Sequence, residues 1–355
     1  MKIAVIGAGI SGMYVAYKLG HAHQVTVFDK NDYIGGHTAT KVVRVNSGQY
    51  AIDTGFIVCN NKTYPNFLAL MDALSVRCQP TEMSFAVSCA DTGLEYNGTT
   101  LNRLFAQRQN LVRPKFWRMA LEILRFNKLA KSLLTLGSID TQHTLGQFLQ
   151  KHNFSGWVVT HYIAPMTAAI WSTPLRDVLN FPLAFFLNFC DNHGLLNIND
   201  RPQWYSIKGG SDQYVKALVT RSKAKFETNT KIARVTRTEN NVELHLENGS
   251  IHFFDKLVLA CHSDQALNLL TDASAQEQTI LSAIPYEESD VLLHTDTRLL
   301  PKRKLAHAAW NYLLSEKDRL PTLTYHMNIL QGINSPETFC VTLNRKDAIT
   351  PEKIL

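Results

Sequence analysis

KIAVIGAGISG, residues 2–12, joins a continuous apolar run to three glycines spaced as GxGxxG. Residues 2–6 predict a strand buried on both faces of a parallel sheet, and residues 13–19 continue with helical periodicity. Residues 24–29 predict a second strand, which ends in the acidic residue Asp29. Because strand, glycine turn, helix, strand and terminal acid occur in this order, the segment predicts a βαβ unit that binds a dinucleotide.

Each glycine of this turn has its own structural task. Gly7 permits the tight turn, Gly9 lets the backbone approach a pyrophosphate, and Gly12 allows close packing of helix on strand. The N-terminus of the helix offers unpaired N–H groups and a partial positive charge to phosphates, and Asp29 can accept hydrogen bonds from ribose hydroxyls. The predicted contacts of this unit are Gly7, Ala8, Gly9, Ile10, Ser11, Gly12, Asp29 and Lys30.

The composition narrows the class of protein. A chain of 355 residues is longer than one compact core usually organises, so we expect two domains. Its six cysteines include no CxxC pair and its thirteen histidines form no HExxH pattern, which predicts reduced thiols, a cytoplasmic location and no metal site. No uncharged apolar stretch reaches about 18 residues, so we expect no transmembrane helix.

A second pair of glycines, Gly35 and Gly36, follows Asp29 closely. Residues 42–45 and 49–53 then predict a hairpin, where a simple nicotinamide dehydrogenase would continue with another βα unit. Together with the opening unit, these motifs resemble the flavin amine oxidase superfamily, which includes monoamine oxidases, phytoene desaturases and protoporphyrinogen oxidase. The resemblance implies FAD as the cofactor.

The same resemblance implies further contacts with FAD. In the family the backbone of the glycine pair lies along the pyrophosphate and an arginine usually follows it, whereas this chain has His37 and lacks that permanent cation. IKGGSDQYVKAL, residues 207–218, resembles the segment where the chain re-enters the FAD domain. The contacts implied in this way are Gly35, Gly36, His37, Thr54, Gly55, Val235, which brackets the adenine, and Ala260, which ends a buried strand beside the cofactor.

A narrower resemblance extends along essentially the whole chain. DTGFIVCNNKTYPN at residues 53–66, DNHGLL at 191–196 and RPQW at 201–204 are similar to a bacterial subfamily described as NAD/FAD-binding or amine-oxidase-like. What is known of this subfamily points to the modification of lipid acyl chains. The activity implied is that of an FAD-dependent oxidoreductase that transfers a hydride from an apolar small molecule or lipid to the flavin.

The fold implied by the resemblance is α/β with two domains. A Rossmann-like FAD-binding domain of the GR2 type, residues 1–60 and 202–272, carries an inserted α+β substrate domain, residues 61–201 and 273–355. The family closes its flavin site with a glycine-containing segment near the C-terminus, but no glycine follows Gly332. We therefore expect this closing element to be missing and the chain to be a fragment. Two alternatives stay open: an NAD(P)-dependent dehydrogenase, and a non-catalytic, membrane-associated flavin-binding fragment.

Residues 101–134 concentrate positive charge. They contain eight Lys and Arg against the single anion Glu122, whereas the whole chain carries only +6. Apolar residues from Phe116 to Leu133 recur there at helical spacing. The pattern is typical of a solvated helix face, and also of a helix that lies on an anionic membrane surface, here the inner face of the membrane. No nucleic-acid motif accompanies the charge, so we expect no nucleic-acid partner.

The sequence offers no Ser-His-Asp or paired-carboxylate constellation for acid–base or nucleophilic catalysis. By the family resemblance, flavin chemistry needs positioning and exclusion of water more than such groups. The weak candidates for the substrate site are aromatic: Trp171, Trp310 and Tyr325. The cations of PKRK, residues 301–304, are interpreted as an exposed turn.

Overall fold

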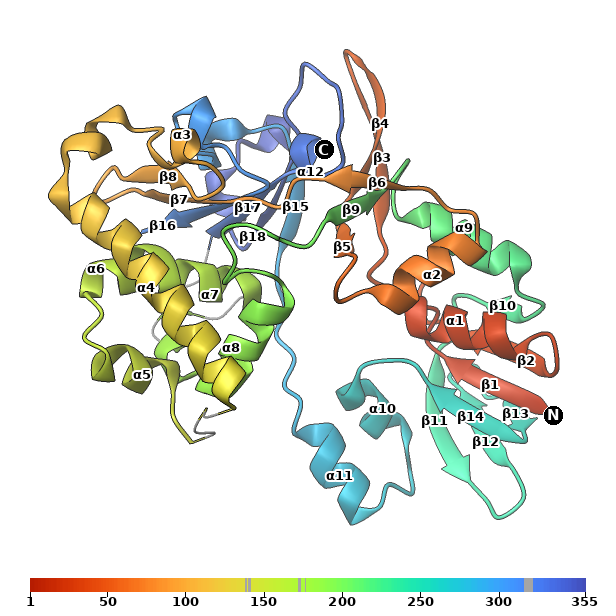
Figure 1. The fold of residues 1–355 in the computed structure, drawn as a ribbon. Helices are drawn as coiled ribbons and strands as arrows, with labels where there is room; N and C mark the ends of the chain where they lie inside the picture. Colours follow the sequence, from red (N-terminus) through yellow and green to blue (C-terminus); the bar gives the residue numbers. More distant parts are fainter. Residues whose placement is uncertain (138, 140–141, 172–173, 176, 316–321) are drawn as a thin grey trace.

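The computed structural model describes residues 1–137, 139, 142–171, 174–175, 177–315 and 322–355. Figure 1 shows two groups of elements, one around the N-terminal strand and the other around a sheet near the C-terminus. The connection from α11 (Ala275–Ser282) to β15 (Val291–His294) runs from the first group to the second (Figure 1).

A parallel sheet forms the centre of the first group, with strand order β10-β2-β1-β14. Its strands are β1 (Lys2–Ile6), β2 (Gln24–Phe28), β10 (Lys225–Glu227) and β14 (Lys256–Leu259). Both faces are covered, as the apolar β1 requires. Ile3 and Val5 pack with α1 (Ile10–Leu19), whereas Ala4 and Ile6 pack with the antiparallel sheet β11-β12-β13.

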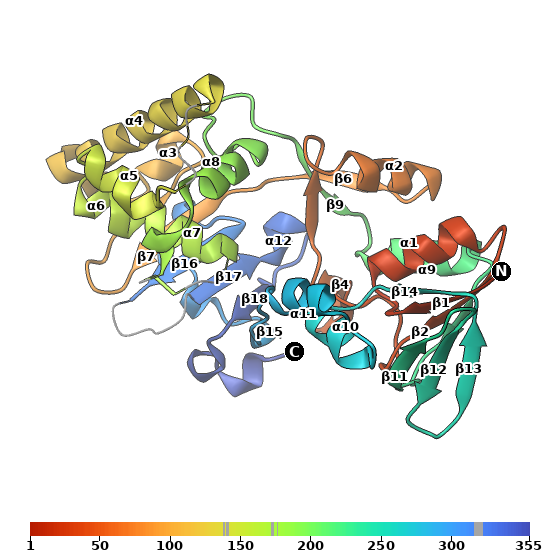
Figure 2. The same cartoon turned by 90° about the horizontal axis from the view of Figure 1, so that it is seen from below.

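Figure 2 shows this layering, with α1 and α9 on one side of the parallel sheet and the antiparallel sheet on the other. The covering elements are α9 (Asp212–Arg221), β11 (Ile232–Arg237), β12 (Val242–Leu246) and β13 (Ile251–Phe254). The predicted βαβ unit is therefore confirmed. Segments more than 200 residues apart share one sheet because β14 pairs directly with β1.

The second group contains a six-stranded sheet in the order β15-β18-β17-β16-β7-β8. Its remaining strands are β7 (Phe85–Cys89), β8 (Glu95–Asn97), β16 (Trp310–Leu314), β17 (Thr322–His326) and β18 (Cys340–Leu343). β7 and β16 pair in parallel, with Phe85 opposite Trp310. This pairing joins two strands that are more than 220 residues apart in the sequence.

Helices cover one side of this sheet, as Figure 1 shows for α4 to α8. They are α4 (Pro114–Leu136), α5 (Leu145–Lys151), α6 (Gly156–Val158), α7 (Ala164–Trp171) and α8 (Leu183–Asn192), with α3 (Leu101–Leu104) before them and a π-helical turn, Val159–Ile163, between α6 and α7. Met119 and Phe126 of α4 join Val87 of β7 and Phe186 of α8 in the largest buried apolar cluster. The apolar spacing seen in the sequence thus anchors α4 to the sheet.

Short sheets and helices complete the fold. They are the hairpin β3 (Thr40–Val45) and β4 (Gly48–Asp53), the sheet β5 (Val58–Asn60), β9 (Trp204–Ile207) and β6 (Cys78–Thr81), and the helices α2 (Pro65–Ala73), α10 (Ser263–Leu269) and α12 (Met327–Leu330). β9 lies between β5 and β6, so residues of the 191–207 segment come beside residues 58–60. Within the described ranges, no helix is long and apolar enough to cross a membrane.

Candidate functional site: a glycine-lined cradle and an apolar cavity

The two glycine motifs lie directly against each other. The Gly35 amide donates to the carbonyl of Ala8 at 2.9 Å, and Gly35 forms a parallel β-bridge with Gly9. A Cβ atom on Gly36 would lie 2.9 Å from the Cα of Gly9, and Gly36 has a φ of +59°. Side chains are therefore excluded where the two loops touch.

The N-terminus of α1 is open on the side that the sequence assigns to phosphate. Gly9 caps the helix without any side-chain hydrogen bond, and a Cβ atom on Gly9 would meet nothing within 4 Å. Ile10 and Ser11, the first residues of the helix, are exposed. A Cβ on Gly12 would instead lie 1.9 Å from the Gly7 carbonyl oxygen, so Gly12 serves packing. Uncapped amides at the end of a helix are well suited to bind a phosphate.

Asp29 lies at the end of β2, beside the glycine turn. Its Oδ2 accepts a hydrogen bond from the Ala8 amide at 2.8 Å, and its Oδ1 accepts one from the Asn31 amide at 2.9 Å. These bonds fix the carboxylate, and each oxygen keeps a further lone pair for a ligand hydroxyl. Lys30 follows on the exposed side of the turn.

The segment containing Thr54 and Gly55 continues the same surface toward the second group of elements. The Thr54 amide donates to the carbonyl of Ala39 at 2.8 Å, and the Phe56 amide donates to that of His37 at 3.0 Å. A Cβ on Gly55 would lie only 1.8 Å from the His37 carbonyl oxygen. Glycine is thus required at position 55 to bring residues 54–56 alongside the loop after Gly36.

A buried aspartate that the sequence did not identify anchors this segment. Asp53 Oδ1 accepts from the hydroxyl of Thr40 at 2.6 Å and from the amide of Ser211 at 2.9 Å. Its Oδ2 accepts from Nε2 of Gln331 at 3.0 Å. A Cβ on Gly210 would meet the Thr40 side chain at 2.5 Å, which explains the glycine at this position of the segment 207–218. Burial raises the pKa of Asp53, against the lowering effect of the Thr40 and Ser211 hydrogen bonds.

The remaining implied contacts differ in their setting. The Ala260 carbonyl packs against Gly7, where a Cβ atom would lie 2.6 Å from its oxygen, so Ala260 borders the glycine turn. Val235 is fully buried in the core between the two sheets, and its carbonyl accepts a hydrogen bond from the Thr271 amide at 3.1 Å. A contact of Val235 with adenine stays a prediction.

His37, which replaces the family's arginine, is part of an aromatic stack. Its ring lies parallel to that of His262, with centroids 5.4 Å apart, and His262 in turn stacks on Tyr286 at 4.4 Å. His262 precedes α10, so the stack connects the glycine-pair loop to the end of the parallel sheet. Stacking thus holds the His37 imidazole beside the loop of the glycine pair. A contact of His37 with the pyrophosphate stays a prediction.

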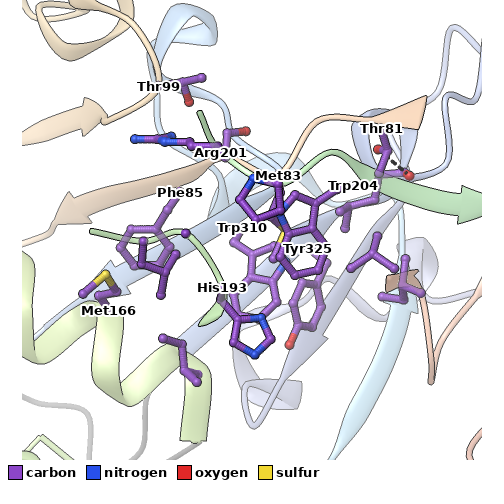
Figure 3. Close-up of a pocket in the computed structure, with 18 of the residues that line it drawn as sticks. Thr81, Met83, Phe85, Thr99, Met166, His193, Arg201, Trp204, Trp310 and Tyr325 are labelled. Atoms are coloured by element: carbon purple, nitrogen blue, oxygen red, sulfur yellow. Dashed lines mark hydrogen bonds between the residues drawn. The ribbon is translucent and has the colours of Figure 1, made fainter. Parts of the chain in front are cut away.

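A cavity of about 760 Å³ begins at Thr54 and Gly55 and extends between the helices and the six-stranded sheet. The three aromatic residues singled out in the sequence, Trp171, Trp310 and Tyr325, all line it. The rings of Trp310 and Tyr325 meet edge to face, with centroids 5.2 Å apart. Figure 3 shows Trp310 and Tyr325 together in the middle of this cavity. Its volume is within the usual range for small-molecule sites.

Several lining residues were not predicted as site residues. His193, Arg201 and Trp204 come from the segment after α8, and Met166 comes from α7. The ring of His193 stacks on Phe189 at 4.2 Å. DNHGLL and RPQW contain three of these residues, so the two segments that carried the family resemblance were the available signal.

The cavity is aromatic and apolar, with little charge. Arg201 is the only charged side chain among its described lining residues, and no Asp or Glu is among them. Burial raises the pKa of Tyr325 and of Tyr162 to about 12, so both hydroxyls stay protonated near neutral pH. Burial also lowers the pKa of His193, helped by the charge of Lys62. No group of His, Cys, Asp and Glu placed to hold a metal ion occurs in the described ranges.

The basic segment has an unexpected arrangement. Phe116, Met119 and Phe126 face the core, but three apolar side chains of α4 are exposed: Trp117 at 43%, Leu121 at 62% and Leu124 at 46%. They share the outer side of the helix with Arg118, Arg125, Lys128 and Lys131, which are also exposed. Lys302, Arg303 and Lys304 lie on an exposed turn, as interpreted from the sequence.

The glycine cradle at the end of the parallel sheet defines a nucleotide-binding fold of the Rossmann type, with the cavity beside it. The model of the flavin containing amine oxidoreductase family matches residues 10–329, and the chain belongs to this family. It is accordingly an FAD-dependent oxidoreductase with a Rossmann-like domain, as the sequence predicted. No curated protein matches the chain by sequence.

Solved structures of similar fold span nearly the whole chain. A CLA-producing fatty acid isomerase from P. acnes has 18% identity and a TM-score of 0.66, covering 99% of this chain and 79% of its own. Cyclohexylamine oxidase from Brevibacterium oxydans has 17% identity and a TM-score of 0.68, with coverage of 99% and 78%. Putrescine oxidase bound to putrescine has 13% identity and a TM-score of 0.62, with coverage of 99% and 79%. At these identities the similarity concerns the fold.

Proposed function

We propose that this enzyme oxidises an apolar substrate, a lipid acyl chain, in the cavity that begins at Thr54 and Gly55. The observation that carries the proposal is the lining of this cavity, which is aromatic and aliphatic and contains no carboxylate among its described residues. Burial of an acyl chain against such a lining gains about 25 cal/mol per Å² of apolar surface. The name of one structural neighbour, a fatty acid isomerase, supports a lipid substrate for this fold.

The proposed FAD site follows the two glycine motifs. The uncapped N-terminus of α1 and the backbone at Gly35 and Gly36 would hold the pyrophosphate, and Asp29 would hold the ribose. The open space over Gly9 fits such a ligand. We assign this role to a domain made of residues 1–60 and 202–272, with residues 61–201 and 273–355 forming the substrate domain.

FAD, when bound, supplies the hydride acceptor. The chain's own residues provide binding, orientation and exclusion of water. Trp310 and Tyr325 lie edge to face and present a rigid wall to the substrate. The Tyr325 hydroxyl makes no hydrogen bond within the described part of the chain, so its proton is available to a polar group of the substrate. Asp53 directly precedes residues 54–56 and fixes their position through its hydrogen bonds to Ser211 and Gln331.

The outer side of α4 is proposed to bring the enzyme to its substrate. Exposed Trp117, Leu121 and Leu124 alternate with exposed cations along this helix. An amphipathic helix of this kind lies in the interface of an anionic membrane, with its apolar side chains among the acyl chains. We propose peripheral attachment to an anionic membrane surface through residues 101–134.

Anaerobic mixing of the FAD-loaded protein with substrates tests the proposed activity. Oleate dispersed in detergent is expected to bleach the oxidised flavin absorbance, whereas benzylamine and putrescine leave it unchanged. Bleaching by the amines and not by the lipid would refute the lipid assignment. Thermal stabilisation by NADH but not by FAD would favour the dehydrogenase alternative.

A further inference from the structure

We propose that Arg201 binds the anionic head group of a single-chain amphiphile whose tail fills the apolar cavity. The inference rests on the proposed function, because it names the chemical class of substrate for the same cavity. It goes further by assigning a binding site for the head group and an orientation to the bound molecule.

Arg201 combines access to solvent with a place in the cavity wall. Its side chain is exposed, and it also lines the cavity together with Gly98 and Thr99. Figure 3 shows Arg201 close to Thr99 on one side of the cavity, with His193 and the hydroxyl end of Tyr325 on the other. Arg201 therefore marks a mouth through which a polar head can stay hydrated while an apolar tail enters.

The guanidinium of Arg201 is available for a ligand. Its Nε donates to the carbonyl of Asn197 at 2.9 Å, which fixes the side chain without neutralising it. Arg201 makes no ion pair with any residue that the structure describes, and no carboxylate lines the cavity among those residues. The two remaining NH₂ groups match the geometry of a carboxylate or a phosphate, which an arginine binds through two parallel hydrogen bonds.

The same charge balance disfavours a protonated amine. An ammonium group needs a counter-charge or several acceptors when it leaves water, and the lining offers an arginine instead. Repulsion from Arg201 adds to this cost. The cavity thus selects against the alkylamines for which members of this family are named, and it favours an anion of similar chain length.

The tail would run from the mouth toward the flavin side. Phe85, Met166 and Ile170 belong to the apolar wall of the substrate domain, and Trp310 and Tyr325 to the middle. Thr54 and Gly55 lie at the other limit of the cavity. With the head group held at Arg201, the C–H bonds that could lose a hydride lie along the tail. The length of the cavity sets how far these bonds are from the head group.

A carboxylate and a phosphate are both compatible with this site, and they come from different sources: a free fatty acid or a lysophospholipid. Binding of oleate, oleoyl lysophosphatidate, methyl oleate and oleylamine to the FAD-loaded protein, below their critical micelle concentrations, distinguishes them. Quenching of tryptophan fluorescence reports binding without turnover, because three of the five tryptophans, Trp171, Trp204 and Trp310, line the cavity.

At least one of the two anions is expected to bind about tenfold more tightly than the methyl ester and the amine. R201Q should remove this preference and leave methyl oleate binding unchanged, R201K should keep part of it, and R44Q, at an exposed arginine elsewhere, should keep all of it. Equal affinity for ester and anion, tighter binding of the amine, or an equal loss for ester and anion in R201Q would overturn the inference. Flavin bleaching by methyl oleate together with an unchanged anion preference in R201Q would overturn the Arg201 site and leave the proposed lipid oxidation standing.

Discussion

The carboxylate of Asp53 accepts hydrogen bonds from both the amide and the hydroxyl of Ser211, each at 2.9 Å. Gln331 completes the site, since its Oε1 accepts from the Asp53 amide at 2.9 Å and its Nε2 donates to the carboxylate. Asp53 ends β4, Ser211 precedes α9 in the first group, and Gln331 follows α12 in the second. The fully buried side chain of Asp53 therefore connects both groups of elements. Thr54 and Gly55 follow Asp53 directly and form the cavity wall next to the glycine cradle.

Asp53→Ala is expected to lower the free energy of unfolding by about 2–4 kcal/mol. The amide of Ser211 and the amide group of Gln331 would lose a buried acceptor, and each unsatisfied donor costs about 1–3 kcal/mol. Urea unfolding followed by circular dichroism measures the change, with Glu288→Ala, at an exposed carboxylate, as the control. Equal stability of the two variants would show that Asp53 does not connect the two groups.

His37→Arg is expected to tighten FAD binding by about tenfold. Arginine restores the permanent cation that the family places after the glycine pair, and a hydrogen bond between charged groups contributes about 1.5–3 kcal/mol. The loss of stacking on His262 offsets part of this gain. Titration of the apoprotein with FAD, followed by flavin fluorescence, gives the dissociation constant. An unchanged or weaker affinity would mean that residue 37 does not face the pyrophosphate.

Reversing the charge at Arg118, Arg125 and Lys128 is expected to abolish binding to anionic vesicles. Each basic residue near such a surface contributes about 1 kcal/mol, so three reversals should weaken binding by more than about a hundredfold. Sedimentation with phosphatidylglycerol vesicles is the measurement. The matched control reverses Lys208, Lys223 and Lys256, three exposed cations outside the helix. Equal binding of the wild-type protein to neutral and anionic vesicles would contradict the electrostatic attachment.

His294 is expected to make stability rise with pH between about 4 and 6.5, in addition to His326, whose pKa burial also lowers to about 4. Burial lowers the pKa of His294 from 6.5 to about 4, so in this window the unfolded chain binds a proton that the folded protein excludes. Its Nε2 lies 2.7 Å from the hydroxyl of Thr342, and its Nδ1 accepts from the Asp296 amide. One such proton makes the free energy of unfolding rise by up to about 1.4 kcal/mol per pH unit.

His294→Gln should therefore flatten the dependence of unfolding free energy on pH between about 4 and 6.5, relative to the wild type. Denaturant titrations at several pH values measure the slope. The control, His21→Gln, changes an exposed histidine and should keep the wild-type slope. A slope in His294→Gln equal to that of the wild type would show that His294 is already charged in the folded protein.

The cofactor cradle could be predicted because its signal is local. Residues 2–29 contain strand, turn, helix, strand and acid in one stretch, and each glycine has a conformational or packing reason that can be stated from sequence alone. The contact of Gly9 with Gly35 was not predicted; it brings together two glycine motifs that the sequence had each indicated separately. Val235 was assigned by resemblance alone; its side chain is buried, and its contact with adenine stays a prediction.

The cavity and the Asp53 site depend on contacts that no local pattern contains. Asp53 meets Ser211 and Gln331 across 158 and 278 residues, respectively. Trp310 reaches the cavity because β16 pairs with β7 in parallel, a register that the spacing of apolar residues does not specify. The apolar spacing of residues 116–133 predicts a helix with an apolar side, but tertiary packing decides which side of α4 is covered, and Leu121 stays exposed.

Reconstitution with FAD tests the central claim most directly. The refolded or apo chain, incubated with FAD and desalted, is expected to keep one FAD per chain and a flavin absorbance spectrum. Gly36→Ala should lose it, since the new Cβ would lie 2.9 Å from the Cα of Gly9, whereas Gly156→Ala, where a Cβ meets nothing within 4 Å, should keep it. A folded wild-type chain that retains no FAD, or a Gly36→Ala variant that retains as much as the wild type, would contradict the assignment of the glycine cradle as the flavin site.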